Sequence, residues 1–212
     1  MDKKLGKYYK WFAVLICLTG FIVLAKCVTD NSIASFDSMI YKYISCFRCD
    51  FVTVFAKILT NLAGVIELIA ACAMILIFVK PRRMGVIITL NLVWAVIVSQ
   101  VLKRIFARPR PADIMLISSH GYSFPSGHAT CSAAFYGFFI YLLWKSKLSK
   151  GKKLIGTAVL SAVILCICIT RIYLGVHYAS DILAGVLLAV VCIITYSSVA
   201  NKYLPQASKE KE

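Results

Sequence analysis

The chain has 212 residues, 60% of them apolar, and a formal net charge of +15. This apolar share exceeds the roughly 45–50% of ordinary soluble domains, which excludes a soluble globular protein and indicates a membrane protein. The length suits one domain, so we expect a single domain over residues 1–205 and a polar tail over 206–212.

A positive charge of this size can also indicate nucleic-acid binding, so the positions of the cations matter. Fifteen of the 24 Lys and Arg residues share one side of the membrane if both termini are cytoplasmic. They are Lys3, Lys4, Lys7, Lys10, Lys80, Arg82, Arg83, Lys145, Lys147, Lys150, Lys152, Lys153, Lys202, Lys209 and Lys211. The positive-inside rule accounts for this bias. We therefore expect a multi-pass cell-membrane protein with cytoplasmic termini and no nucleic-acid partner.

Apolar runs long enough to cross a bilayer recur along the chain, since a transmembrane helix needs about 20 such residues. Six helices are predicted, at Trp11–Val28, Asn61–Val79, Gly85–Leu102, Ala129–Trp144, Leu154–Thr170 and Ile182–Val199. The alternation of polar and apolar residues that is typical of a transmembrane β-barrel is missing. The expected fold class is therefore all-α, a polytopic membrane protein with six transmembrane helices.

An amphipathic segment follows the first predicted span. Its apolar residues recur every three or four positions from Phe36 to Phe47, a spacing typical of one face of a helix. Such a helix either lies in the outer membrane interface or packs on the other spans. Cys46 and Cys49 form a C-x-x-C pair at its end, which is compatible with a helical turn, a disulfide or a metal site.

Two loops, over residues 103–125 and 170–181, are separated by two predicted crossings, so they emerge on the same face of the membrane. This is the outer face if the termini are inside. The cations that break the positive-inside pattern are concentrated on these loops and their helix ends: Lys103, Arg104, Arg108, Arg110 and Arg171. All three histidines lie there too, and His120 is expected to be a solvated loop residue.

Lys103, Arg110 and Arg171 are predicted to lie at helix ends on this one face. Charges within a bilayer are costly and persist where they are paired or functional, and like charges repel unless an anion lies between them. Arginine forks match phosphate oxygens and lysine adds a point charge. The cluster therefore indicates an anion site, although each side chain taken alone could simply extend to the interface.

Pro125-Ser126-Gly127-His128 is typical of a helix start, with Ser126 as the N-cap. The free backbone N–H groups and the dipole of such a helix end favour an anion. Gly127 would let an oxyanion approach the backbone closely. A plain capped helix is the alternative interpretation.

His177 and Asp181 are four residues apart, so on a helix they share a face. Asp181 can accept a hydrogen bond from one ring nitrogen and leave the other free to attack phosphorus, as in a catalytic triad. Alternatively, the two residues form a polar pair that fastens two helices.

The three stretches together carry the pattern K-x6-R-P from Lys103, then P-S-G-H from Pro125, then R-x5-H-x3-D from Arg171. With this order of motifs the chain resembles the type 2 phosphatidic acid phosphatase superfamily, which also includes bacterial acid phosphatases, glucose-6-phosphatase and vanadium haloperoxidases. Thr170 stands where that family usually has serine before the arginine. The motifs cover residues 103–181, and the remaining predicted spans fit the membrane branch of the family.

The resemblance implies a role for each matching residue. His177 would be the nucleophile that forms a phosphohistidine, Asp181 would orient it, and His128 would protonate the leaving group. The residues expected to hold the phosphoryl oxygens are Lys103, Arg110, Ser126, Gly127 and Arg171. No metal or cofactor is expected, because the nine acidic residues form no cluster suited to magnesium.

The expected function is metal-independent hydrolysis of a lipid phosphate or pyrophosphate on the extracytoplasmic face, with undecaprenyl pyrophosphate as the leading substrate. Phosphatidylglycerophosphate, phosphatidic acid and transfer of the phosphoryl group to another lipid are the alternatives. A non-catalytic phosphate-binding membrane protein is disfavoured, because binding alone requires no nucleophile such as His177. The sequence does not determine the oligomeric state.

Overall fold

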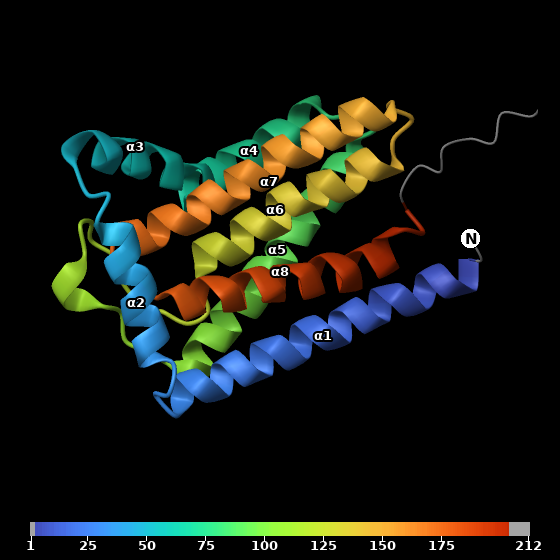
Figure 1. Ribbon diagram of the computed structural model, residues 1–212. Helices are drawn as coiled ribbons and strands as arrows, with labels where there is room; N and C mark the ends of the chain where they lie inside the picture. Colours follow the sequence, from blue (N-terminus) through green and yellow to red (C-terminus); the bar gives the residue numbers. More distant parts are fainter. Residues whose placement is uncertain (1–2, 204–212) are drawn as a thin grey trace, which may run out of the picture.

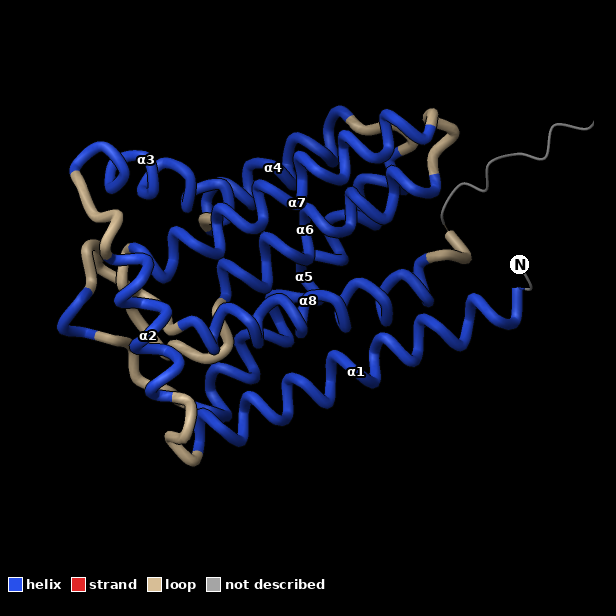
Figure 2. The backbone as a smooth tube through the Cα atoms, viewed as in Figure 1, coloured by secondary structure: helices blue, strands red, loops and turns tan. Residues whose placement is uncertain are grey.

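The computed structural model describes residues 3–203, so the predicted tail over 206–212 lies outside the described residues. Every regular element within residues 3–203 is helical (Figures 1 and 2), which confirms the all-α class. The helices are α1 (Lys3–Thr29), α2 (Ala34–Ser45), α3 (Asp50–Thr60), α4 (Val65–Phe78), α5 (Arg82–Phe106), α6 (Gly127–Lys145), α7 (Lys150–Tyr173) and α8 (Ala179–Ala200). Two 3-10 turns, η1 (Asn61–Ala63) and η2 (Ala112–Ile114), complete the elements.

The long helices run back and forth along one axis, while α2 lies across one end of the bundle (Figure 1). The connections from α4 to α5 and from α6 to α7 lie at the opposite end, together with both described chain ends. The α5–α6 and α7–α8 connections lie beside α2. The bundle therefore has two chemically distinct ends, and all three motifs lie at the α2 end.

Among the described residues, four helices are long and apolar enough to cross a membrane: α1 from Tyr8, α5, α7 and α8. The bent pair Asp50–Ala63 and Val65–Phe78, with 47° between its halves, can make a fifth span. The predicted second span, Asn61–Val79, is therefore the second half of a longer, broken element. Helix α6 is not among the helices apolar enough to cross a membrane, so the count of six spans stays a prediction.

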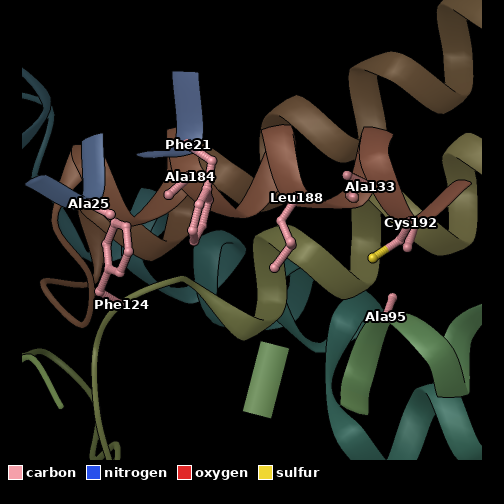
Figure 3. Close-up of a cluster of buried hydrophobic side chains, with 10 residues drawn as sticks. Phe21, Ala25, Ala95, Phe124, Ala133, Ala184, Leu188 and Cys192 are labelled. Atoms are coloured by element: carbon pink, nitrogen blue, oxygen red, sulfur yellow. The ribbon is translucent and has the colours of Figure 1, made fainter. Parts of the chain in front are cut away.

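Helix α6 is the centre of the bundle, because it packs against α5, α7 and α8. Small buried residues on α6, such as Ala133 and Ala134, allow this close approach. At Gly185 of α8, an added Cβ would lie only 2.8 Å from the carbonyl oxygen of Ser126. Figure 3 shows one of the apolar clusters that result, which joins Phe21 of α1, Ala133 of α6 and Leu188 of α8.

The amphipathic segment predicted from Phe36 to Phe47 forms helix α2, which has one packed and one exposed apolar face. Phe36, Ile40 and Ile44 pack on buried residues of α7 and α8. Met39 and Tyr43 are exposed. Packing on the other helices thus accounts for one apolar face, and the location of the other face in the membrane interface stays a prediction. Downstream of α2, the thiols of the C-x-x-C pair are both free and exposed.

Candidate active site

The candidate site lies at the α2 end of the bundle, where the end of α5 and the end of α7 meet the starts of α6 and α8. The connection between α7 and α8 turns tightly through Gly175, whose φ of +69° suits glycine. A Cβ at Gly175 would also collide with the backbone of Ile114. This turn places His177 two residues before α8, whose N-cap is Tyr178.

His177 and Asp181 meet as the four-residue spacing predicts. The Nδ1 atom of His177 lies 3.3 Å from Oδ2 of Asp181, and Nε2 lies 3.1 Å from Nη1 of Arg110. Because a guanidinium has donors only, Nε2 must accept from Arg110. The ring proton is therefore on Nδ1, where Asp181 accepts it, and the Nε2 lone pair points to the cation cluster.

Burial holds His177 in the neutral form that a nucleophile needs. It lowers the pKa of His177 to about 3, although Asp181 acts in the opposite direction, and Arg110 and Lys103 lower it further. A buried imidazole loses the hydration that stabilises its charged form. At neutral pH the ring of the unliganded protein is therefore uncharged.

Asp181 is fully buried and hydrogen-bonded on both oxygens. The hydroxyl of Ser123 and the backbone N–H of Tyr178 donate to Oδ2, and Nη1 of Arg108 donates to Oδ1 over 2.7 Å. Arg108 also bonds Asp37 of α2. No sequence motif points to a role for these supporting residues. Arg108 stood out only as one of the excess outer cations, and no local spacing links residue 37 to residue 108.

The three predicted phosphate-binding cations come together at the end of α5, in the following loop and at the end of α7. Lys103 donates from Nζ to the carbonyl oxygens of Tyr122 (2.7 Å) and Ser123 (3.2 Å). Arg171 donates to the hydroxyl of Thr60 over 2.9 Å, and its Nε is buried without a partner.

Arg110 is held by backbone carbonyls, including that of Val176 at 2.7 Å. Among the described residues, Lys103, Arg110 and Arg171 form no ion pair with any carboxylate. Buried or half-buried charges without a counter-charge are costly. Cations without a paired carboxylate favour the binding of an anion.

The start of α6 faces this cluster. Ser126 caps the helix, since its Oγ accepts from the backbone N–H of Ala129 at 3.4 Å. The backbone N–H of Ser126 donates to the carbonyl of Asp181 over 3.0 Å, which ties α6 to α8. A Cβ at Gly127 would lie 3.6 Å from the Cε of Lys103, so the Lys103 side chain runs beside the first turn of α6.

His128 follows in the first turn of α6 and is partly exposed. Its ring forms no hydrogen bond to any described residue, while the charges of Arg171, Arg110 and Lys103 act on it. His128 is therefore available to a ligand at the cluster. His120, by contrast, is exposed in the loop, and only its carbonyl touches the site, by accepting from Arg110 at 3.2 Å.

The arrangement offers an oxyanion three cations, a capped helix start, a neutral imidazole with a directed lone pair and a second imidazole. Positioned positive charge of this kind is what phosphoryl transfer requires, since its transition state carries charge on the equatorial oxygens. Within residues 3–203, no three His, Cys, Asp or Glu side chains gather in a way that could hold a metal ion.

The sequence matches the PAP2 superfamily over residues 83–204, which is more than half of the chain and contains all three motifs. The chain belongs to this superfamily, and the resemblance inferred from the motifs is confirmed. Together with its apolar helices, this membership makes it a helical membrane protein of the PAP2 type.

Two relatives cover most of this chain. Phosphatidylglycerophosphatase B of Bacillus subtilis (strain 168) is 29% identical over 170 residues, which are 78% of this chain and 83% of the relative. An undecaprenyl-diphosphatase of Sulfolobus acidocaldarius is 27% identical over 188 residues, 86% of each chain.

Solved structures show the same fold. The crystal structure of a transmembrane PAP2-type phosphatidylglycerolphosphate phosphatase from Bacillus subtilis matches with a TM-score of 0.82 and 23% identity, covering 94% of this chain and 100% of that one. The crystal structure of Aquifex aeolicus LpxE matches with a TM-score of 0.60 and 27% identity over 76% of this chain and 93% of that one.

Because the three cations lack counter-charges, we expect orthovanadate to bind and stabilise the unliganded protein. Saturation at 100 times the dissociation constant corresponds to about 2.7 kcal/mol, measurable as a rise in the melting temperature in detergent. Arg110→Met should remove most of this shift. Arg104→Met, which removes an exposed cation from the same helix end, should retain it. Equal shifts in the two variants would contradict the anion site.

Proposed function

We propose that the protein hydrolyses lipid phosphates or pyrophosphates without a metal ion, through a phosphohistidine on His177. The observation that carries the proposal is the neutral His177 ring, which Asp181 orients so that its Nε2 lone pair faces Arg110, one of three cations without a paired carboxylate. A site that only bound phosphate would need the cations but not the oriented nucleophile.

In the first step the substrate phosphate enters the cation cluster and accepts the hydrogen bond that Arg110 donates to Nε2 of His177. The lone pair of Nε2 is thereby released. Nε2 attacks phosphorus, the P–N bond forms, and the bond from phosphorus to the lipid oxygen breaks. His128 donates a proton to that oxygen, so the lipid leaves as an alcohol, or as a monophosphate from a pyrophosphate. Lys103 and Arg171, with the hydroxyl of Ser126 and the backbone N–H of Gly127, stabilise the equatorial oxygens.

In the second step water attacks the phosphohistidine. His128 accepts a proton from the water, the P–N bond breaks, and inorganic phosphate leaves with His177 restored to neutrality. Asp181 accepts a hydrogen bond from Nδ1–H throughout and stabilises the charge that develops on the ring. If a lipid hydroxyl replaces water, the same intermediate makes the protein a phosphotransferase.

The lipid class follows from the apolar helices and from the relatives, whose names point to phosphatidylglycerophosphate and to undecaprenyl diphosphate. Undecaprenyl pyrophosphate is our leading substrate, and phosphatidylglycerophosphate and phosphatidic acid are the alternatives. A pyrophosphate brings more negative charge to the three cations than a monoester does, which favours the leading choice.

Substrate choice can be tested with the purified protein in detergent. Inorganic phosphate release should be fastest with undecaprenyl pyrophosphate, and at least about tenfold slower in kcat/KM with the glycerolipid monophosphates, a difference of about 1.4 kcal/mol in transition-state binding. The reverse order would assign the protein to glycerophospholipid metabolism. Release from none of these lipids would overturn the proposed function.

Replacing His177 by Asn should reduce turnover to below a few per cent, because no other described side chain at the site offers an oriented lone pair. Wild-type protein quenched with 32P-labelled substrate should carry acid-labile phosphate, and the His177→Asn variant should carry none. Both results should be the same in EDTA. Labelling that persists in the variant would remove His177 as the nucleophile, and loss of activity in EDTA that magnesium restores would overturn the metal-free mechanism.

We further propose that the site faces the extracytoplasmic side. The cation-rich connections at Lys80–Arg83 and Lys145–Lys153 lie at the end of the bundle away from the site, with both described chain ends (Figure 1). Moving each Lys or Arg through the bilayer costs roughly 2.5–3.5 kcal/mol at the helix centre, so this bias favours a single orientation with that end in the cytoplasm.

Cysteine accessibility in intact cells tests this orientation. In a background without Cys27, Cys46 and Cys49, Ser118→Cys should react with an impermeant thiol reagent, because residue 118 lies on the exposed loop at the site. Lys150→Cys should react only after the cells are opened. The opposite labelling pattern would place the site in the cytoplasm and exclude an outer-leaflet substrate.

A further inference from the structure

A buried ion pair lies beside the site and uses no residue of the phosphate cluster. Nη2 of Arg108 lies 2.8 Å from Oδ2 of Asp37, and Nη1 lies 2.7 Å from Oδ1 of Asp181. The side chains of Arg108 and Asp37 are only 13% and 3% exposed. One guanidinium thus bridges a carboxylate of α2 and the carboxylate that orients the nucleophile.

Ser180 joins the same network. Its backbone N–H donates to Oδ1 of Asp37 over 2.8 Å, and its hydroxyl lies 2.7 Å from Oδ2 of Asp37 and 2.8 Å from Nη1 of Arg108. The guanidinium carbon of Arg108 also lies 3.9 Å from the centre of the Tyr178 ring. Two carboxylates therefore hold the terminal nitrogens of Arg108, and the Tyr178 ring packs against the face of its guanidinium.

We propose that Arg108 and Asp37 are a positioning pair for the Asp181–His177 couple: Arg108 fixes the Asp181 carboxylate and balances its charge, and Asp37 holds Arg108 in place. This inference rests on the proposed role of His177. Asp37 lies outside the three motifs, and Arg108 occupies an unspecified position of the first motif.

The contacts separate Arg108 from the phosphate-binding arginines. Arg110 and Arg171 contact no carboxylate, whereas both terminal nitrogens of Arg108 are occupied by carboxylates. Burial by itself would lower the pKa of Arg108, but Asp181 and Asp37 raise it above its usual value. A cation whose charge is already balanced twice has little attraction left for phosphate.

The charge balance explains why the pair acts on His177. Asp181, Arg110 and Lys103 are the charged groups that act most strongly on the His177 ring, and His128 and Arg171 lie in the same cluster. If Arg108 alone were removed, Asp37 and Asp181 would face each other as buried carboxylates without a shared cation. Their negative charge would favour a protonated His177, which has no lone pair on Nε2.

Helix α2 delivers Asp37 to this network. The face that carries Phe36 and Ile40 packs on α7 and α8, and Asp37 lies buried beside it. The docking of α2 thereby places a carboxylate within reach of Arg108 in the α5–α6 loop. In this arrangement α2 supports the nucleophile from outside the motif-bearing helices.

Kinetics of four proteins test the proposal: wild type, Arg108→Met, Arg108→Lys and the double variant Asp37→Asn/Arg108→Met. Arg108→Met should lower kcat about 10–100-fold, the range seen when outer partners of functional ligands are lost, with KM changed less than about threefold. The acid limb of its kcat/KM profile should move up by about one pH unit or more. The double variant should recover several-fold in kcat and return the acid limb to the wild-type position, because it removes the unpaired carboxylate.

Arg108→Lys keeps the charge without the fork, so its acid limb should stay at the wild-type position while kcat falls to an intermediate value. Arg104→Met and Asp30→Ala, which remove exposed charges nearby in the chain, should behave as wild type. Dependence on charge in this pattern is not expected of a contact that only stabilises the fold.

A titration without substrate keeps this inference separate from the proposed function. The chain has three histidines, so 15N-histidine NMR in detergent can follow His177, assigned by its loss in His177→Asn. In wild type this ring should stay neutral down to acidic pH, in keeping with its pKa of about 3, and in Arg108→Met it should protonate at clearly higher pH. If the wild type hydrolysed no lipid, the titration would still test whether Arg108 acts on His177, because it needs no substrate.

Three results would overturn the proposal. An Arg108→Met variant with the His177 titration and kcat of wild type would show that Arg108 has no positioning role. A loss confined to KM, with the pH profile unchanged, would make Arg108 a phosphate ligand instead. A double variant no better than Arg108→Met, with its acid limb still displaced, would remove Asp37 from the mechanism.

Discussion

The balance of charge buried at the α2 end of the bundle is the constraint on which the rest of the site depends. Four cations, Lys103, Arg108, Arg110 and Arg171, share this end with two carboxylates, Asp37 and Asp181, both of which bond Arg108. Lys103, Arg110 and Arg171 have no carboxylate of their own and are left for the phosphoryl oxygens of the substrate. The protein thus carries the positive charge that its proposed substrate requires before the substrate binds. In the unliganded protein these cations repel one another.

The fold makes this possible by bringing four helix ends to one place around α6. Close packing of α8 on α6 at Gly185 and the bond from Ser126 to the carbonyl of Asp181 fix the relative height of the two helix starts. The tight turn at Gly175 then places His177 two residues before α8. His177, Asp181 and the capped start of α6 are consequently held side by side, and the cations reach them from α5, its following loop and α7.

The contacts among the motif residues could be predicted from sequence because most of them lie within short segments. The four-residue spacing of His177 and Asp181, and the capping signal at Ser126, are properties of short segments, and two loops separated by two crossings had to share a face. Asp37 could not be predicted, since its partner lies 71 residues away and nothing in the spacing links them. The bend between α3 and α4 also escaped prediction, because composition shows an apolar run and not its direction.

Helix α6 bears on how the molecule is made. Its length suits a membrane crossing, yet it is not among the helices apolar enough to enter a bilayer on that ground, and protein surrounds it on the sides of α5, α7 and α8. A segment of this polarity gains little free energy from hydrocarbon alone, so its place depends on neighbours, two of which are synthesised after it. During biosynthesis the residues gathered at the α2 end cannot all meet until α8, the last helix within residues 3–203, has been made, because Asp181 lies in its first turn.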